Sequence, residues 1–200
     1  MNTVIDFYLD FSSPYGYLAA MKIEALASKY QRRVCWHPIL LGAIFKTTGA
    51  QPLPNVPLKG EYAARDFARS ARYLGLPFRA PSQFPIPTVT AVRAFYWLQT
   101  RDPLRAVDLA KALLHSYFVD DINISQLDGV IQVARTLGID PDALTAGVND
   151  EAVKAITKQE VETAIARGVF GSPYVIIDGE PFWGADRLEQ IAQWLATGGF

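Results

Sequence analysis

Residues 4–20 read VIDFYLDFSSPYGYLAA, and this stretch decides the fold. It opens with strand-forming side chains interrupted by Asp6, which predicts a short, mostly buried strand. Ser13 and Pro14 then supply a helix cap and a proline at the first helical position, and the apolar spacing that follows is helical. We therefore expect a strand that runs directly into a helix N-terminus carrying an exposed hydroxyl, where the helix dipole favours an anion.

The same place in a thioredoxin-like fold carries the motif C-P-x-C, and here it reads Ser13-Pro14-Tyr15-Gly16. Without either cysteine, this loop cannot carry out dithiol exchange. A serine hydroxyl can instead donate a hydrogen bond to a thiolate that a ligand brings. Lowering the pKa of a thiol by about two units takes about 2.7 kcal/mol, and one hydrogen bond to a charged group supplies about 1.5–3 kcal/mol. The plainer alternative is that Ser13 is only an N-cap.

Composition narrows the class of protein. Half of the 200 residues are apolar and the formal net charge is −1, so a sizeable core is expected and a nucleic-acid partner is not. The first residues lack the basic segment of a signal peptide, and no apolar run approaches a membrane span. The single cysteine, Cys35, excludes an internal disulfide and is expected to be a small buried apolar residue. We expect a cytoplasmic protein without a membrane partner.

The elements are expected in the order βαβ, then a helical segment, then ββα. Residues 32–41 predict a second strand, parallel to the first. His37 is interpreted as a strand-end residue and no metal site is expected, because no second ligand lies at a helical or loop spacing from it. Within the helical segment, Asp102 and either Asn149 or Asp150 are expected to begin helices, and Ser125 and Asp128 form the pattern of a capping box. After it, Asp178-Gly179 predicts a hairpin turn.

The two ends of the chain are expected to combine into one sheet. This predicts an α/β protein with a thioredoxin-like fold and a large all-helical insertion: residues 1–41 and 168–200 form the discontinuous thioredoxin-like domain, and residues 42–167 the insertion. Ser172-Pro173 stands where this fold keeps a cis-proline, at a cost of about 0.5–1 kcal/mol. Such a bond turns the preceding backbone groups outward, where a peptide-like ligand such as a tripeptide thiol can pair with them.

Four motifs carry a resemblance that covers essentially the whole chain. They are DFSSPYGYLA (10–19), PLKG (57–60), GVFGSPYVIIDG (168–179) and PFWGADRL (181–188). In this order they resemble the 2-hydroxychromene-2-carboxylate isomerases, and the wider group that contains kappa-class glutathione transferases and bacterial disulfide-oxidase-like proteins.

The resemblance implies glutathione as the cofactor. It implies that Ser13 holds the glutathione sulfur beside the backbone of Pro14 and Tyr15, and that the main chain of Ser172, before cis-Pro173, pairs with the cysteinyl part. The remaining implied contacts with glutathione come from Ala185 and Asp186 at the γ-glutamyl end, with Asp186 on its ammonium group, and from Lys59 near the glycine carboxylate. The implied aromatic wall around a small aromatic substrate consists of Phe11, Tyr15 and Trp183.

Three positions depart from the family pattern. Ala50 stands where an asparagine often follows the glycine of a loop, Ala185 replaces the serine of the kappa enzymes, and Gly16 replaces a common serine. Losing two polar contacts would weaken glutathione binding by about 1–3 kcal/mol.

The leading functional hypothesis is a glutathione-dependent cis–trans isomerase of aromatic degradation, in which a thiolate held by Ser13 adds to a conjugated double bond and is expelled after rotation. A glutathione transferase or peroxidase would use the same serine, and a non-catalytic member would bind glutathione, a peptide or a small acid in the same groove. A disulfide oxidoreductase is disfavoured because both thiols are missing. Relatives are often dimers, which leaves a homodimer open.

Overall fold

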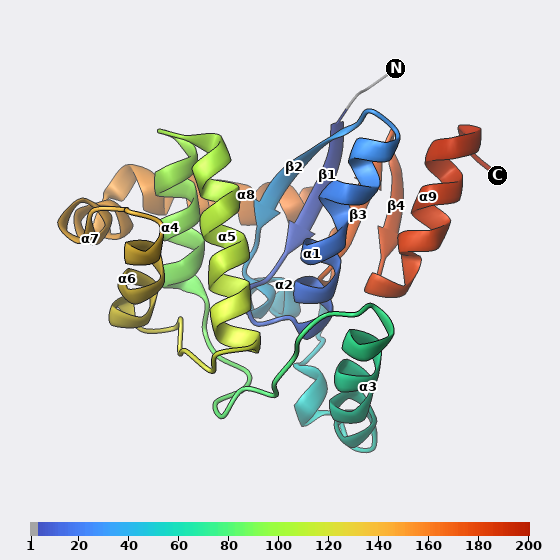
Figure 1. The fold of residues 1–200 in the computed structure, drawn as a ribbon, viewed down its shortest axis with the longest axis horizontal. Helices are drawn as coiled ribbons and strands as arrows, with labels where there is room; N and C mark the ends of the chain where they lie inside the picture. Colours follow the sequence, from blue (N-terminus) through green and yellow to red (C-terminus); the bar gives the residue numbers. More distant parts are fainter. Residues whose placement is uncertain (1–3) are drawn as a thin grey trace.

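The computed structural model describes residues 4–200 and has a four-stranded mixed sheet at its centre (Figure 1). The strands are β1 (Val4–Leu9), β2 (Arg33–Pro38), β3 (Tyr174–Ile177) and β4 (Glu180–Trp183), in the spatial order β2-β1-β3-β4. β1 is parallel to β2 and antiparallel to β3, and β4 is antiparallel to β3. The sheet thus joins strands from both ends of the chain, which confirms the predicted α/β fold with a helical insertion.

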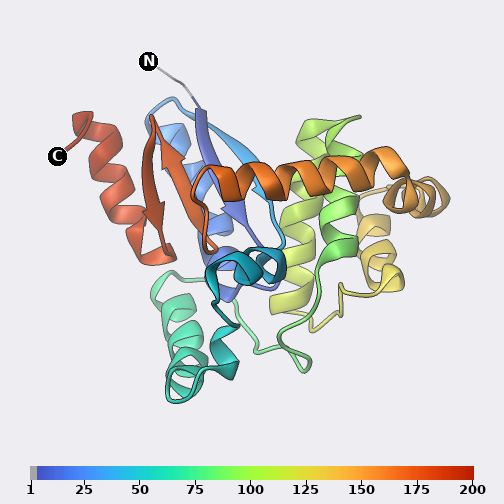
Figure 2. The same cartoon turned by 180° about the vertical axis from the view of Figure 1, so that it is seen from behind.

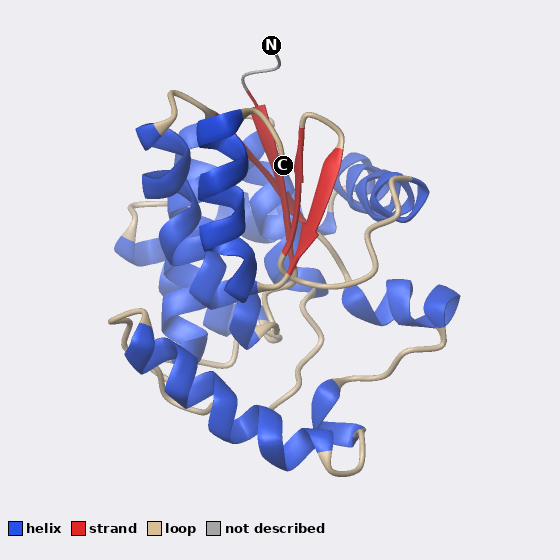
Figure 3. Cartoon of the chain, turned by 90° about the vertical axis from the view of Figure 1, so that its right-hand side faces the viewer, coloured by secondary structure: helices blue, strands red, loops and turns tan. Residues whose placement is uncertain are grey.

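The helices cover both faces of this sheet. They are α1 (Pro14–Lys29), α2 (Leu41–Thr48), α3 (Lys59–Tyr73), α4 (Val89–Gln99), α5 (Pro103–Phe118), α6 (Leu127–Thr136), α7 (Pro141–Asn149), α8 (Glu151–Ala166) and α9 (Leu188–Thr197), with short 3-10 turns η1 (Leu53–Asn55) and η2 (Ala185–Arg187). Figure 3 shows the layers edge-on, with α1 and α9 on one face, and Figure 2 shows α8 crossing the other. In the part of the chain that the structure describes, none of these helices has the length and apolar character needed to cross a membrane.

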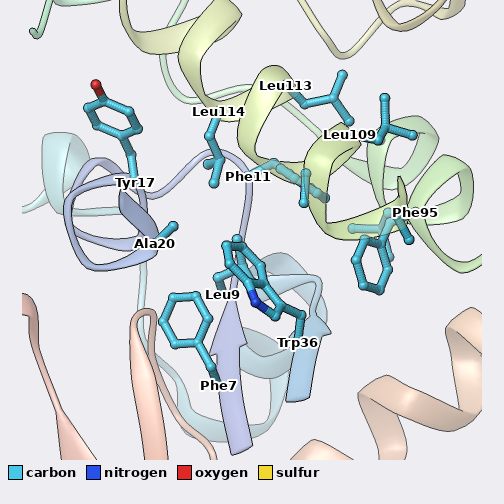
Figure 4. Packing of buried hydrophobic residues seen from close by; sticks show 14 of the residues in the cluster. Phe7, Leu9, Phe11, Tyr17, Ala20, Trp36, Phe95, Leu109, Leu113 and Leu114 are labelled. Carbon is cyan, nitrogen blue, oxygen red and sulfur yellow. The ribbon is translucent and has the colours of Figure 1, made fainter. Parts of the chain in front are cut away.

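Side-chain alternation along β1 assigns its residues to two different clusters. Phe7 and Leu9 join the main core with Trp36 of β2 and residues of α1 and α5 (Figure 4). Tyr8, on the opposite face, belongs to a smaller cluster that includes Ala164 of α8. Asp6 lies on this second face too, so the polar interruption seen in the sequence falls on the side of the sheet that α8 covers.

Several helices begin at the capping residues that the sequence predicts. Asp102 accepts a hydrogen bond from the Arg105 amide, and Asp150 accepts one from the Ala152 amide. The predicted capping box of α6 is wrong. The helix begins one residue later than the pattern requires, with Gln126 as its N-cap and no side-chain capping bond, and the hydroxyl of Ser125 donates to Oδ1 of Asn123 at 2.6 Å. The domain boundaries at residues 41/42 and 167/168 stay a prediction.

The contact between α7 and α4 generates a stability prediction. A Cβ at Gly147 of α7 would overlap the buried ring of Trp97 on α4. Gly147→Ala is therefore expected to lower the free energy of unfolding by about 1–3 kcal/mol, measured by urea denaturation. Gly42→Ala in α2 is the matched control: its Cβ would meet no atom within 4 Å, so stability should stay unchanged or rise by up to about 1 kcal/mol. Equal urea midpoints for Gly147→Ala and Gly42→Ala would contradict the close contact between Gly147 and Trp97.

Candidate functional site

The start of α1 and the segment before β3 meet at Ser13. The Ser13 hydroxyl donates a hydrogen bond to the main-chain oxygen of Ser172 at 2.9 Å and accepts one from the Gly16 amide at 3.0 Å. The hydroxyl oxygen of Ser172 in turn accepts a hydrogen bond from the Asp10 amide at 2.9 Å. The peptide bond between Ser172 and Pro173 is cis. The Ser13 hydroxyl thus joins the start of α1 to the segment before β3, which is far from it in the sequence.

The surroundings of Ser13 differ from the sequence expectation in one respect. Only 7 % of its surface is exposed, so the hydroxyl is buried rather than freely exposed. Ser13 is the N-cap of α1, as the plainer interpretation requires, but this role leaves open whether its hydroxyl also meets a ligand. Two hollows of the described surface, of about 270 Å³ beside Trp97 and about 740 Å³ beside Trp194, do not include Ser13 among their lining residues. Its contact with a ligand stays a prediction.

Gly16 allows the two serines to approach. A Cβ at this position would lie 2.8 Å from Oγ of Ser172 and 3.0 Å from Cβ of Ser13. Any side chain at residue 16, including the serine expected from the resemblance, would displace one of its two neighbours. Glycine at residue 16, where the family commonly has serine, therefore leaves room for the close contact between Ser13 and Ser172.

Asp10 is a buried carboxylate that sequence reasoning missed as a site residue. Its Oδ1 accepts hydrogen bonds from the Ser12 amide at 2.7 Å and the Thr88 hydroxyl at 3.2 Å, and its Oδ2 accepts one from the Leu41 amide at 2.8 Å. Burial raises the pKa of Asp10, while these three donors act against the rise. Asp10 therefore fixes the loop between β1 and α1 to the starts of α2 and α4. The available signal was an acid at the end of an apolar strand, directly before the Ser-Ser-Pro sequence.

Tyr15 lies between α1 and α3. Its hydroxyl donates to Oδ2 of Asp66 at 2.6 Å, and its ring packs edge-on against Phe67. Burial, the hydrogen bond to Asp66 and the nearby charges of Asp66 and Asp186 raise the pKa of Tyr15, so its phenol stays protonated near neutral pH. Asp66 is a second residue that sequence reasoning missed.

The charged residues expected at the two ends of glutathione are on the surface. The Asp186 side chain is exposed, lies 3.6 Å from the Arg187 guanidinium, and follows Ala185, which is buried. Lys59 is exposed at the first turn of α3, and among residues 4–200 no carboxylate forms an ion pair with it. Ala50 is exposed after α2. The two charged side chains are therefore accessible to a ligand.

The three expected aromatic wall residues have different surroundings. Phe11 has no exposed surface and packs in the main core (Figure 4), so it is a core residue rather than part of an accessible wall. The apolar residues around Phe11 in the sequence do not distinguish a buried core residue from one that lines an accessible wall. Trp183 is 56 % exposed, packs against Phe170 with 4.9 Å between ring centroids, and covers Gly171, where a Cβ would overlap its indole. Trp183 and the half-buried Tyr15 remain candidates for contact with a substrate.

Comparison with known proteins agrees with this fold over almost the full length. The family described as DSBA-like thioredoxin domain matches residues 4–196. Glutathione S-transferase kappa 2 of Caenorhabditis elegans is 30% identical, with 96% of this chain and 92% of that protein aligned. The 2-hydroxychromene-2-carboxylate isomerase of Sphingobium xenophagum is 28% identical, with 98% and 99% aligned.

A solved structure supports the same assignment. A 2-hydroxychromene-2-carboxylate isomerase superposes with a TM-score of 0.87 at 24% identity, covering 96% of this chain and 94% of that one. Because the sequence identity is low, this structural likeness is evidence for the fold alone. The chain therefore belongs to the family of DsbA-like thioredoxin domains, with relatives among the kappa-class glutathione transferases and the 2-hydroxychromene-2-carboxylate isomerases.

Proposed function

We propose that this protein is a glutathione-dependent cis–trans isomerase of the 2-hydroxychromene-2-carboxylate type. The observation that carries the proposal is a serine, in place of a cysteine, whose hydroxyl lies at the junction of the α1 N-terminus and the cis-proline segment. The alignment with the Sphingobium isomerase, at 28% identity over 98% of this chain, supports it. Glutathione is the proposed cofactor, a small aromatic compound the proposed substrate, and the cytoplasm the proposed location.

In the proposed reaction, glutathione supplies the nucleophile. When bound, it would supply a thiolate for reversible addition to a conjugated double bond, which would rotate while the thiolate is attached. The thiolate would leave as it came, so no proton or electron would be gained or lost in the cycle.

The role proposed for Ser13 follows from its single hydroxyl proton. This proton, which is donated to the Ser172 carbonyl in the structure, would turn to the glutathione sulfur. The carbonyl released by this rotation would accept the cysteinyl amide of glutathione. A hydrogen bond of about 1.5–3 kcal/mol and a helix N-terminus of about 0.3–1 kcal/mol together suffice to lower the thiol pKa by about two units.

The rest of the proposed site surrounds this hydroxyl. The backbone of Pro14 and Tyr15 lies beside the sulfur, and the segment Ser172-Pro173 faces the cysteinyl group. The remaining proposed contacts are Lys59 with the glycine carboxylate, Ala185 and Asp186 with the γ-glutamyl end, and the rings of Tyr15 and Trp183 with the substrate. The exposure of Lys59, Asp186 and Trp183 supports these roles. A homodimer stays a prediction.

A kappa-type glutathione transferase is the second candidate. The 30% identity with Glutathione S-transferase kappa 2 of Caenorhabditis elegans favours it. The two reactions differ in the fate of glutathione: an isomerase returns it after each turnover, and a transferase accumulates a conjugate. Measuring free thiol during turnover separates them, because the thiol concentration stays constant in the first case and falls in the second.

Ser13→Ala tests the proposed thiolate. We expect the pKa of bound glutathione to rise by about two units and turnover at neutral pH to fall roughly 100-fold, because the thiolate fraction falls by that factor. The ultraviolet absorbance of the bound thiolate measures the first change and an isomerase assay the second. Ser12→Ala is the control, because the Ser12 hydroxyl accepts a hydrogen bond from the Ile86 amide. Unchanged turnover in Ser13→Ala would remove the mechanism.

Gly16→Ser tests the close approach of the two serines. Its Cβ would crowd Ser13 and Ser172, so we expect glutathione to bind at least tenfold more weakly, a loss of about 1.4 kcal/mol or more. Titration calorimetry provides the measurement. Gly42→Ser, in open surroundings on α2, should bind as the unaltered protein does. Full affinity of Gly16→Ser for glutathione would show that Ser13 and Ser172 accommodate the added side chain without weakening binding.

Asp186→Asn tests the proposed ammonium contact. Removing one charged partner is expected to raise KM for glutathione by roughly 10- to 100-fold with little change in kcat, because a hydrogen bond between charged groups contributes about 1.5–3 kcal/mol. Glu189→Gln, an exposed acid in the first turn of α9, is the matched control for the lost charge. Identical KM values for the two variants would place the γ-glutamyl end elsewhere.

A further inference from the structure

The sheet face beneath α8 carries a polar cluster that lies apart from the proposed glutathione site. Asp6 of β1 is the register partner of Cys35 on β2, and His37 lies two residues further along β2. Because side chains alternate across a sheet, all three point to the face opposite Phe7 and Trp36. A carboxylate oxygen, the thiol sulfur and a ring nitrogen from the three residues lie within 4.8 Å of one another, and each residue is half-buried.

The His37 ring is held in a fixed orientation. Its Nε2 lies 2.9 Å from Oδ1 of Asp6, and its Nδ1 lies 3.3 Å from Oε2 of Glu160 on α8. The ring of Tyr8 stacks on the imidazole, with 4.6 Å between centroids. A carboxylate on the outer nitrogen is the usual partner of a metal-binding histidine, since it fixes the tautomer and the ring direction.

We propose that Asp6, Cys35 and His37 bind Zn²⁺, with Glu160 as the positioning residue of the imidazole. Thiolate, imidazole and carboxylate are the three protein ligands that zinc prefers. A thiolate and an imidazole disfavour Mg²⁺ and Ca²⁺, which select oxygen ligands. Zinc bond lengths of about 2.0–2.3 Å bring tetrahedral ligand atoms to about 3.5 Å from one another. The three ligand atoms already lie within 4.8 Å of one another, which is close to this spacing.

Both carboxylate oxygens of Asp6 have partners in this cluster. The guanidinium of Arg167 binds Oδ2 at 2.7 Å, and Nε2 of His37 lies 2.9 Å from Oδ1. Metal ligands must be deprotonated, so a cation would take the place of the proton between Nε2 and Oδ1 and would bind Cys35 as a thiolate. The contact between Arg167 and Oδ2 would stay in place.

Three protein ligands leave one coordination position open to water. The site would link β1 to β2 on the face opposite the main core. It is built from strand residues that take no part in the proposed reaction. Zinc is therefore expected to raise the stability of the folded chain by binding it in preference to the unfolded chain.

The test uses the full-length protein, freed of metal by dialysis against a chelator. Cobalt(II) serves as a spectroscopic probe, because a thiolate ligand produces a charge-transfer absorption that water and carboxylate ligands do not. We expect one equivalent of Co²⁺ to produce this band, one equivalent of Zn²⁺ to displace it, and Zn²⁺ to raise Tm. Absence of the band in the unaltered protein overturns the proposal without recourse to any variant.

Substitutions then assign the ligands. Cys35→Ser, which nearly preserves the volume, should abolish the band, and Glu160→Gln should weaken Zn²⁺ binding about 10- to 100-fold. His37→Gln should eliminate tight binding. His115→Gln should leave binding unchanged, because this exposed residue of α5 pairs with Asp120 and does not belong to the cluster of Asp6, Cys35 and His37. A band that survives Cys35→Ser, or binding that depends on His115, would overturn the assignment.

Discussion

The pairing of β1 with a parallel strand on one side and an antiparallel strand on the other is the constraint on which the molecule depends. It brings the two ends of the chain into one sheet and leaves the helical segment between them outside. It also sets what each face of β1 contacts. Phe7 and Leu9 point into the main core, whereas Asp6 and Tyr8 point toward α8. The strand ends at Leu9, and the three hydrogen bonds accepted by the carboxylate of Asp10, directly after it, fix the loop that presents Ser13.

The sequence was informative wherever local signals and long-range packing agree. The strand before Ser13, the helix starts after Asp102 and Asp150, and the turn at Asp178 are set by residues close to one another in the chain, and all lie where the patterns predict. Ser125 shows the limit of such patterns, because the helix begins one residue later, with Gln126 as its N-cap.

What sequence reasoning missed depends on contacts across the chain. The exposure of Phe11 cannot be derived from its neighbours, because helix α5 determines whether an aromatic ring there is covered (Figure 4). Asp66 meets Tyr15 only through the placement of α3. Cys35 was expected to be a buried apolar residue, yet it is half-buried beside Asp6 and His37. The spacing of possible ligands along the chain does not reveal partners on adjacent strands, because those partners depend on the register between the strands.

The bare backbone at Gly16 limits what simple substitution could install in this loop. Dithiol chemistry would require sulfur at both ends of the Ser13–Gly16 segment. A Cβ at residue 16 would lie 2.8 Å from the hydroxyl oxygen of Ser172, so a second cysteine there would force that side chain to move. Two cysteine substitutions would therefore also disturb a third residue that is distant in the sequence.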